Sequence, residues 1–359
     1  VTWVATSVSS VQAYYSLNNG TGWTAIGSPV AAANGTVSWD IDNDTQVSNV
    51  ALVKVEDVAN PTVVADASNA TFDVIGVFDI THPESGDIVI AEDAYNITWI
   101  KKGIGINNVV LQYSTDYGNN WTYVVGSGNN TVPNAGSYYW ASVPGTVLSH
   151  YCKVRIIDPE NAFVNDTGAG YFDLRGAVSV TRPAGGESWD MATIQNINWT
   201  KKGNIATVDI SYSWNNGTNW TTLASAVPGS DLTWPWNITA SYQTTTTGKI
   251  KVADSLNADV VYDISQGTFG IKGKLTVTAP SDPGIVLTYG AAPYNITWQK
   301  FGTIANVNLS YSTDGGITYP NSIDTNVNVT TGTPYAWGIP DAIGTNLSVK
   351  ITDTSDPSV

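Results

Sequence analysis

The amino-acid sequence predicts an all-β protein made of four tandem repeats of one antiparallel β-sandwich. The first observation is a phrase that returns four times, with its strand tyrosines 98, 99 and 99 residues apart: Tyr15, Tyr113, Tyr212 and Tyr311. The second observation is the period-2 alternation of apolar and polar residues between turns rich in Gly, Asn and Pro. The third is the lack of a convincing stretch with helical periodicity. So regular a period indicates one small domain copied in tandem.

The third repeat is complete and shows the expected strands in order. A short strand ends at Pro183, a Gly-rich turn follows, and a strand with Ile197 and Trp199 comes next. The remaining strands are expected at 208–212, 220–223, 232–238, 250–252 and 269–271. About seven short alternating strands predict a two-sheet antiparallel sandwich of the immunoglobulin or fibronectin-III kind.

The large aromatic residues of these strands share the phase of their aliphatic neighbours, so we expect them in the core. Cys152 alternates in step with Val154 and Ile156 and is expected to be a small core residue. As the only cysteine, it excludes an intramolecular disulfide or a cysteine metal cage. The tryptophans expected inside are Trp99, Trp199, Trp298, Trp39, Trp140, Trp337 and one of the pair Trp234/Trp236.

Short linkers around a glycine predict domains at residues 1–75, 76–175, 176–272 and 273–359. Linkers of one or two residues allow little free swing, so we expect a semi-rigid rod. The first domain lacks the strands that precede the Trp-bearing strand elsewhere, and the fourth lacks the last strand. Two explanations stay open: the chain is a window from a longer array, or neighbouring molecules complete each other by strand addition.

The composition of the chain limits which kinds of partner it can bind. The 359 residues carry a formal net charge of −15, a pI of about 4.2 and only 13% charged residues. Nucleic acid is excluded as a partner because phosphate binding needs a basic stripe. No apolar run is long enough to span a bilayer. We expect any signal or anchor to lie outside this segment.

One turn of the third repeat reads Pro183-Ala-Gly-Gly-Glu-Ser-Trp189 and is followed by Ile197-Asn-Trp199; looser versions are Pro83-Glu-Ser-Gly86 and Pro280-Ser-Asp-Pro-Gly284. With these turns the repeats resemble the immunoglobulin-like (fibronectin-III-like) repeats of large prokaryotic cell-surface proteins. The resemblance implies an adhesin, a stalk, an envelope layer or an accessory part of an exported enzyme.

A second resemblance lies in the hairpins. Ser312-Thr-Asp-Gly-Gly-Ile-Thr-Tyr319 and Ser114-Thr-Asp-Tyr-Gly-Asn-Asn-Trp121 are similar to the Asp-box of sialidases, Ser-x-Asp-x-Gly-x-Thr-aromatic. Asn19 and Asn216 are expected to replace the Asp in the first and third repeats. In sialidases this box lies away from the active site, and the chain's three arginines are not paired with a repeated acid. The sequence therefore predicts that the Asp or Asn side chain binds amides of its own turn, an arrangement we call a stitch, and that the chain is not an enzyme.

Catalytic and metal-binding patterns are sparse. His82 and His150 are the only histidines, and His82 is expected to be a solvated strand end. We therefore predict no catalytic residue and no cofactor. A weak calcium candidate is the turn with Asp40, Asp42 and Asp44, which has the spacing of a calcium loop's opening but lacks its Gly and distal Glu.

The strongest chemical pattern is N-glycosylation. Half of the chain's 32 asparagines stand in Asn-x-Ser/Thr sequons, several of them at outward strand positions. The sixteen sequon asparagines are Asn19, Asn34, Asn43, Asn69, Asn96, Asn120, Asn129, Asn165, Asn198, Asn216, Asn219, Asn237, Asn295, Asn308, Asn328 and Asn346.

These patterns favour a non-catalytic structural protein of an extracellular filament, stalk or surface layer, built of glycosylated repeats joined end to end. Its partners would be copies of itself or adjacent repeats, together with its N-linked glycans. One alternative is a carbohydrate-binding adhesin array that grips surface polysaccharide with Trp121, Trp220 and Trp214 beside the hairpins. Another is the spacer of an exported enzyme.

Overall fold

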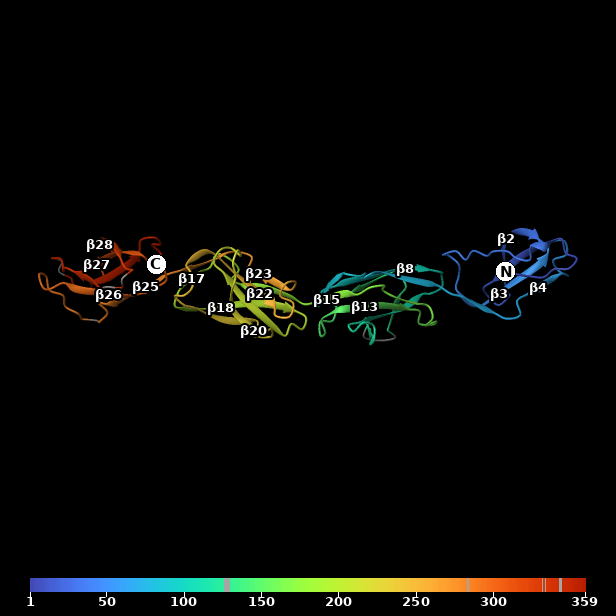
Figure 1. Ribbon diagram of the computed structural model, residues 1–359, viewed down its shortest axis with the longest axis horizontal. Helices are drawn as coiled ribbons and strands as arrows, with labels where there is room; N and C mark the ends of the chain where they lie inside the picture. The colour runs from blue at the N-terminus through green and yellow to red at the C-terminus, as the bar shows by residue number, and fades with distance from the viewer. Residues whose placement is uncertain (126–129, 283, 331, 333, 342–343) are drawn as a thin grey trace. The chain divides into compact units, whose positions relative to one another are not determined.

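The computed structural model describes residues 1–125, 130–282, 284–330, 332, 334–341 and 344–359 (Figure 1). The described residues form β-strands and one 3-10 helix, η1 (Ala32–Asn34). Within the same residues no helix is long and apolar enough to cross a membrane. The chain divides into two compact units, Val1–Gly176 and Ala177–Val359, and each is described by itself.

The second repeat forms a complete sandwich. One sheet has the order β12-β8-β6, and the other has the order β10-β9-β13-β15-β7, with β11 on β9 and β14 on β13. All pairs are antiparallel except the parallel pair of β7 and β15. The strands are β6 (Val77–His82), β7 (Ile88–Ile90), β8 (Tyr95–Lys102), β9 (Asn108–Ser114), β10 (Thr122–Tyr123), β11 (Thr131–Pro133), β12 (Ser137–Trp140), β13 (Ser149–Ile157), β14 (Asn165–Thr167) and β15 (Phe172–Arg175).

The third repeat has the same two sheets, β16-β18-β21 and β17-β24-β22-β19-β20, with β23 on β22. The strands that the alternation predicts are present, and two short strands that it did not predict, β17 and β23, are added. They are β16 (Ala177–Arg182), β17 (Ser188–Asp190), β18 (Thr193–Lys202), β19 (Thr207–Ser213), β20 (Thr221–Pro228), β21 (Thr233–Ile238), β22 (Thr245–Asp254), β23 (Tyr262–Ile264) and β24 (Phe269–Lys272). This topology confirms the predicted all-β class and the tandem immunoglobulin-like sandwiches.

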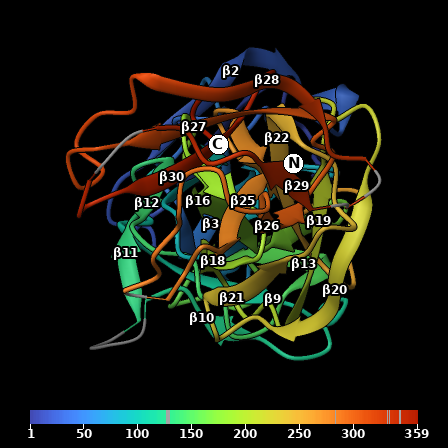
Figure 2. The same cartoon turned by 90° about the vertical axis from the view of Figure 1, so that its left-hand side faces the viewer.

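The first and fourth repeats contain fewer strands. The first has the sheet β2-β1-β3-β4 with β5 on β3; the fourth has β25-β26-β29, whose strands lie side by side in Figure 2, and β28-β27-β30. The strands are β1 (Ser10–Ser16), β2 (Thr24–Ala31), β3 (Ser48–Asp57), β4 (Ala65–Ala67), β5 (Phe72–Val74), β25 (Lys274–Ala279), β26 (Tyr294–Phe301), β27 (Asn306–Ser312), β28 (Asn321–Asn328), β29 (Tyr335–Trp337) and β30 (Ser348–Asp353).

The predicted core residues lie between the sheets. Trp99 and Trp199 are buried, and Trp236 is the inward member of its pair. Cys152 is fully buried opposite Phe172 of β15, and burial raises the pKa of its thiol to about 11. Trp140 and Trp337 are also buried, whereas Trp39 and Trp298 are only half-buried.

The cores of the second and third repeats differ in one buried polar contact. In the second repeat, the Trp99 indole N–H donates to Asn134 Oδ1 at 2.9 Å, and Asn134 Nδ2 donates to the Ile106 carbonyl at 2.9 Å. The third repeat has Gly229 at the position of Asn134, and a Cβ there would lie 2.3 Å from a backbone oxygen. The buried Trp199 indole N–H consequently has no hydrogen-bond partner.

A buried aspartate lies at the end of one strand of every repeat, as its last residue or, in the second repeat, directly after it, and caps the turn that follows. Its carboxylate accepts the backbone N–H two residues later, at distances between 2.9 and 3.1 Å. The four aspartates are Asp57, Asp158, Asp254 and Asp353. Because the carboxylate satisfies turn amides, its burial does not leave an isolated polar group.

Candidate functional site

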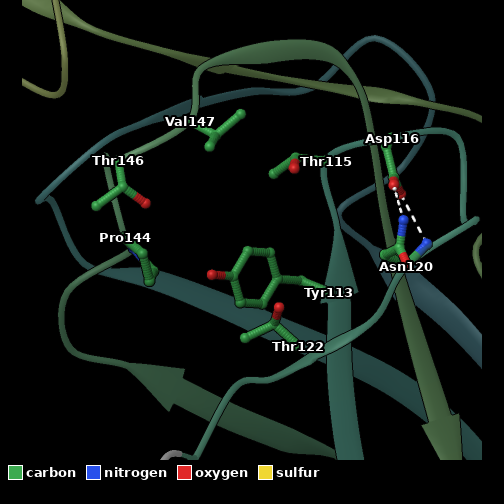
Figure 3. A pocket seen from close by; sticks show the side chains of 8 residues that line it. All are labelled: Tyr113, Thr115, Asp116, Asn120, Thr122, Pro144, Thr146 and Val147. Carbon is green, nitrogen blue, oxygen red and sulfur yellow. Dashed lines mark hydrogen bonds between the residues drawn. The ribbon is translucent and has the colours of Figure 1, made fainter.

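The hairpin with the Ser-x-Asp/Asn phrase has the same hydrogen bonds in all four repeats. In the fourth, Ser312 Oγ accepts the Gly316 N–H at 2.8 Å, and Asp314 Oδ1 accepts the Thr318 N–H at 2.9 Å. Asp116 occupies this position in the second repeat and accepts hydrogen bonds from Asn120. Both residues line a pocket of about 160 Å³ (Figure 3). The pocket is small and the carboxylate in it is bound to amides, so the hairpin is a stitch.

The assignment of Asn19 and Asn216 to the Asp position was wrong. The side chains that accept the turn amides are Asn18 Oδ1, from the Gly22 N–H at 2.8 Å, and Asn215 Oδ1, from the Asn219 N–H at 2.9 Å. Asn19 and Asn216 are the next residues in each hairpin and adopt positive φ angles of 54°. Asparagine tolerates this left-handed backbone better than most residues, which explains why it follows the stitch.

The stitch affects the charge of the two hairpins that carry a carboxylate. Hydrogen bonds from Ser312 and Thr318 lower the pKa of Asp314 well below its ordinary value. Bonds from the Asn120 backbone and side chain, and from Ser114, likewise lower the pKa of Asp116. Both carboxylates therefore stay ionised well into the acid range.

Two of the three aromatic residues expected to bind sugar beside the hairpins are partly covered. Trp121 and Trp220 are half-buried, and the Arg155 guanidinium lies 4.3 Å from the Trp121 ring centroid. Trp214 is exposed.

Three exposed tyrosines of the second repeat form an aromatic surface that sequence reasoning missed; we call it the tyrosine face. Tyr117 stacks on Tyr151 with ring centroids 4.2 Å apart, and Tyr171 meets both rings edge-on at 5.5 and 5.9 Å. They come from the hairpin after β9, from β13 and from the residue before β15. Lys153 Nζ lies 4.9 Å from the Tyr171 centroid.

The tyrosine face belongs to the second repeat alone among the described residues. One backbone hydrogen bond that all four repeats share identifies the matching positions. In the second repeat it runs from the Tyr117 N–H to the Tyr151 carbonyl. The pair Tyr117/Tyr151 becomes Asn19/Val50, Asn216/Thr247 and Gly315/Asn346 in the first, third and fourth repeats. Three of these replacements, Asn19, Asn216 and Asn346, are sequon asparagines. A comparison of the aligned repeats at this corner could have revealed the difference.

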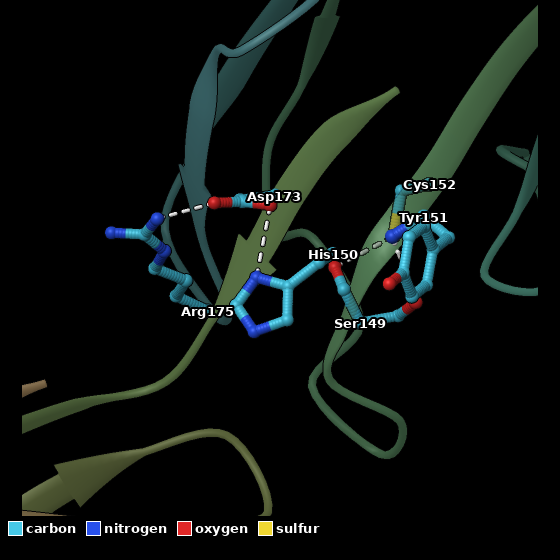
Figure 4. A network of polar contacts seen from close by, with 6 residues as sticks. All are labelled: Ser149, His150, Tyr151, Cys152, Asp173 and Arg175. Carbon is cyan, nitrogen blue, oxygen red and sulfur yellow. Dashed lines mark hydrogen bonds and ion pairs between the residues drawn. The ribbon is translucent and has the colours of Figure 1, made fainter. Parts of the chain in front are cut away.

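Polar groups lie beside the tyrosine face. On β15, Asp173 Oδ1 lies 3.0 Å from His150 Nδ1, and Asp173 Oδ2 forms an ion pair with Arg175 (Figure 4). The Asp173 N–H also donates to the Asp87 carbonyl at 2.8 Å, and the Gly86 N–H donates to the Tyr171 carbonyl at 2.9 Å. The turn between β6 and β7 therefore lies against the strand that carries the tyrosine face.

This turn holds a group of ligand-type side chains. Potential ligand atoms of His82, Glu84 and Asp87 all lie within 4.8 Å of one another. His82 Nδ1 is 3.2 Å from Asp87 Oδ2, which also accepts the Tyr95 hydroxyl at 2.8 Å and the Glu84 N–H at 3.0 Å. Burial alone would raise the pKa of Asp87, but these hydrogen bonds and the His82 charge lower it overall. His82 is exposed, as expected for a strand end, but has a carboxylate partner.

The calcium candidate is arranged differently. Asp40, Asp42 and Asp44 are exposed, and Asp42 Oδ1 accepts the Asp44 N–H at 3.2 Å and the Thr45 hydroxyl at 2.7 Å. Among the described residues, only the His82 trio forms a group of three His, Cys, Asp or Glu side chains with converging ligand atoms. Calcium binding at this turn stays a prediction.

The sequon asparagines lie mainly on the surface. Fourteen of the fifteen that the structure describes are exposed, and the other, Asn198, is half-buried. Asn129 lies outside the described residues. Of the sixteen asparagines outside sequons, nine are exposed. Exposure therefore follows the sequon more closely than it follows asparagine itself.

Comparisons with known proteins identify no family: no family model and no curated protein matches the chain. Solved structures that resemble it include the fibronectin(III)-like modules of Clostridium thermocellum CbhA (12% identity, 55% of this chain and 94% of that chain, TM-score 0.20). Others are the N-terminal four Ig domains of Dscam1 isoform 6.9 (11%, 95% and 83%, 0.21) and Titin-A168169 (8%, 54% and 98%, 0.26). Likenesses this distant carry no information on function.

Proposed function

We propose that this chain is a non-catalytic structural array of an extracellular surface or filament, whose sandwiches display N-linked glycans. The observation that carries the proposal is the exposure of fourteen of the fifteen described sequon asparagines. A sequon that arose by chance in an Asn- and Thr-rich sheet would be no more exposed than other asparagines. A glycan must project into solvent, so real sites require exposure.

The strand sequons support the same proposal. Asn96 and Asn295 occupy matching positions beside the buried Ile97 and Ile296, in strands paired to β12 and β29. Neighbouring side chains of a strand point to opposite faces, so a sugar on either asparagine leaves the core unchanged. The same strand thus provides both the core and the attachment point.

The test is glycopeptide mass spectrometry of the chain purified from its native source. We expect glycans at several exposed sequons, with Asn96 and Asn295 among them, and an unmodified Asn198, because its side chain is half-buried. Unmodified asparagines throughout would refute the proposal. Electron microscopy of the same material would show whether the arrays associate into filaments or sheets.

The tyrosine face supports a second candidate function, an adhesin that binds carbohydrate. Monomeric surfaces rarely gather large exposed apolar groups without a partner. Tyr117, Tyr151 and Tyr171 are 52%, 44% and 39% exposed, and each combines an apolar ring with a polar hydroxyl. A glycan array probed with the wild type and with Tyr151→Ala tests this function. Binding that needs Tyr151 supports it, and no binding to any glycan refutes it.

A further inference from the structure

We propose that the turn between β6 and β7 of the second repeat binds a divalent transition-metal ion of the Zn²⁺ type through His82, Glu84 and Asp87. The three side chains provide one imidazole nitrogen and two carboxylates from six residues of chain. This mixed nitrogen and oxygen set suits Zn²⁺, whereas Ca²⁺ prefers oxygen ligands alone.

The distances need little adjustment to accept an ion. Two ligands that lie about 2.0–2.2 Å from a tetrahedral Zn²⁺ are about 3.3–3.6 Å apart. His82 Nδ1 and Asp87 Oδ2 are already 3.2 Å apart. Glu84 is exposed and within reach, since its ligand atom lies no more than 4.8 Å from the other two. Water would complete the coordination at this exposed turn.

The Asp87 carboxylate is held in position before any ion binds. The Tyr95 hydroxyl from β8 and the Glu84 backbone N–H both donate to Asp87 Oδ2. Such outer hydrogen bonds orient ligands and are typical of metal centres. The turn is further anchored to β15 by the bond from the Asp173 N–H to the Asp87 carbonyl.

The third repeat carries a cationic residue in place of His82 at the matching turn, and this comparison adds to the geometric support for the proposal. Glu187 stands at the position of Asp87 and accepts the Ala184 N–H at 2.6 Å, as Asp87 accepts the Glu84 N–H. Arg182 replaces His82 at this turn. Burial alone would raise the pKa of Glu187, but hydrogen bonds from the backbone and, after them, the positive charge of Arg182 lower it overall. Ala184 removes the third ligand. A cationic side chain thus stands at this turn in one repeat, where its guanidinium donates to Gln195 at 3.1 Å, and a metal ion would supply the positive charge in the other.

The negative charge of the chain favours the same binding. With a net charge of −15, the protein raises the local concentration of divalent cations around it. This general attraction also acts on every exposed acid, so the test has to resolve a single site.

The two histidines make that test direct. Zn²⁺ would be titrated into the full chain while the imidazole resonances of His82 and His150 are followed by NMR, with calorimetry in parallel. We expect one Zn²⁺ per chain and a shift of the His82 ring signals at saturation. His150, whose only carboxylate contact among the described residues is Asp173, should shift little.

Four variants test the assignment. His82→Arg copies the third repeat and should preserve the fold while lowering the Zn²⁺ affinity at least about tenfold; Tyr95→Phe should lower it by a similar factor through Asp87. His150→Ala, the matched control, should bind as the wild type does. The double variant Arg182→His/Ala184→Glu should add a second site. Unchanged affinity in His82→Arg, or loss of binding in His150→Ala, would overturn the proposal.

Discussion

Replacement of Asn134 by Ala tests the buried contact that distinguishes the second repeat from the third. The change removes the hydrogen bonds to the Trp99 indole and the Ile106 carbonyl and leaves the indole N–H buried without a partner. Lost hydrogen bonds and an orphaned buried donor together cost about 2–4 kcal/mol. Since about 1.4 kcal/mol corresponds to a factor of ten, protected amides of β8 should exchange about 30- to 1000-fold faster.

Hydrogen exchange read by mass spectrometry is the assay, because it separates the repeats. Peptides of β8 and β13 should lose protection, and peptides of β18 in the third repeat should not change. The exposed Asn107→Ala is the matched control and should exchange as the wild type does. The double variant Trp99→Phe/Asn134→Ala should be less destabilised than the sum of the single variants. A change below threefold in β8 for Asn134→Ala would refute the reasoning.

Three further predictions concern the hairpins and the sequons. Tyr117→Asn should change the unfolding free energy by less than about 1 kcal/mol, because asparagine tolerates the positive φ of 67° better than tyrosine and this gain offsets the lost ring contacts. Denaturant unfolding curves measure the change. The Asp314 carboxylate stabilises the fourth hairpin fully above its unfolded pKa, and this stabilisation is lost as pH falls through its lowered folded pKa. The backbone amides of the fourth hairpin should therefore exchange hydrogen faster in acid than those of the third, where Asn215 cannot titrate. Asp314→Asn should abolish this difference. Asn96→Gln should remove one glycan mass from the chain and leave its circular dichroism unchanged, and a lost fold would contradict the outward placement.

Much of the fold could be predicted because it rests on local patterns. The alternation around Trp199 and the period of the strand tyrosines specify strands, phase and repetition without tertiary information. The buried position of Cys152 followed from the same phase. The half-buried Trp298 departs from the prediction, because the phase of a strand gives the direction of a side chain and not how completely its repeat covers it.

The candidate sites were harder to predict because they depend on contacts between distant segments. The tyrosine face joins a hairpin, β13 and the start of β15, which no sequence window contains. The acceptor in the first and third hairpins was assigned one residue late, since adjacent asparagines look alike until the turn amides are placed. The His82 trio lies within one short turn, yet its convergence depends on how the backbone folds after β6.

Cys152 gives the second repeat a chemical reporter. It is the only thiol in the chain, has no solvent exposure, and its raised pKa keeps it protonated near neutral pH. A thiol reagent can reach it only when β13 and β15 separate, so its labelling rate measures the opening of one repeat among four. In an oxidising medium the same opening would expose the thiol to the Cys152 thiol of a second chain. A disulfide-linked dimer would then show that this repeat had unfolded.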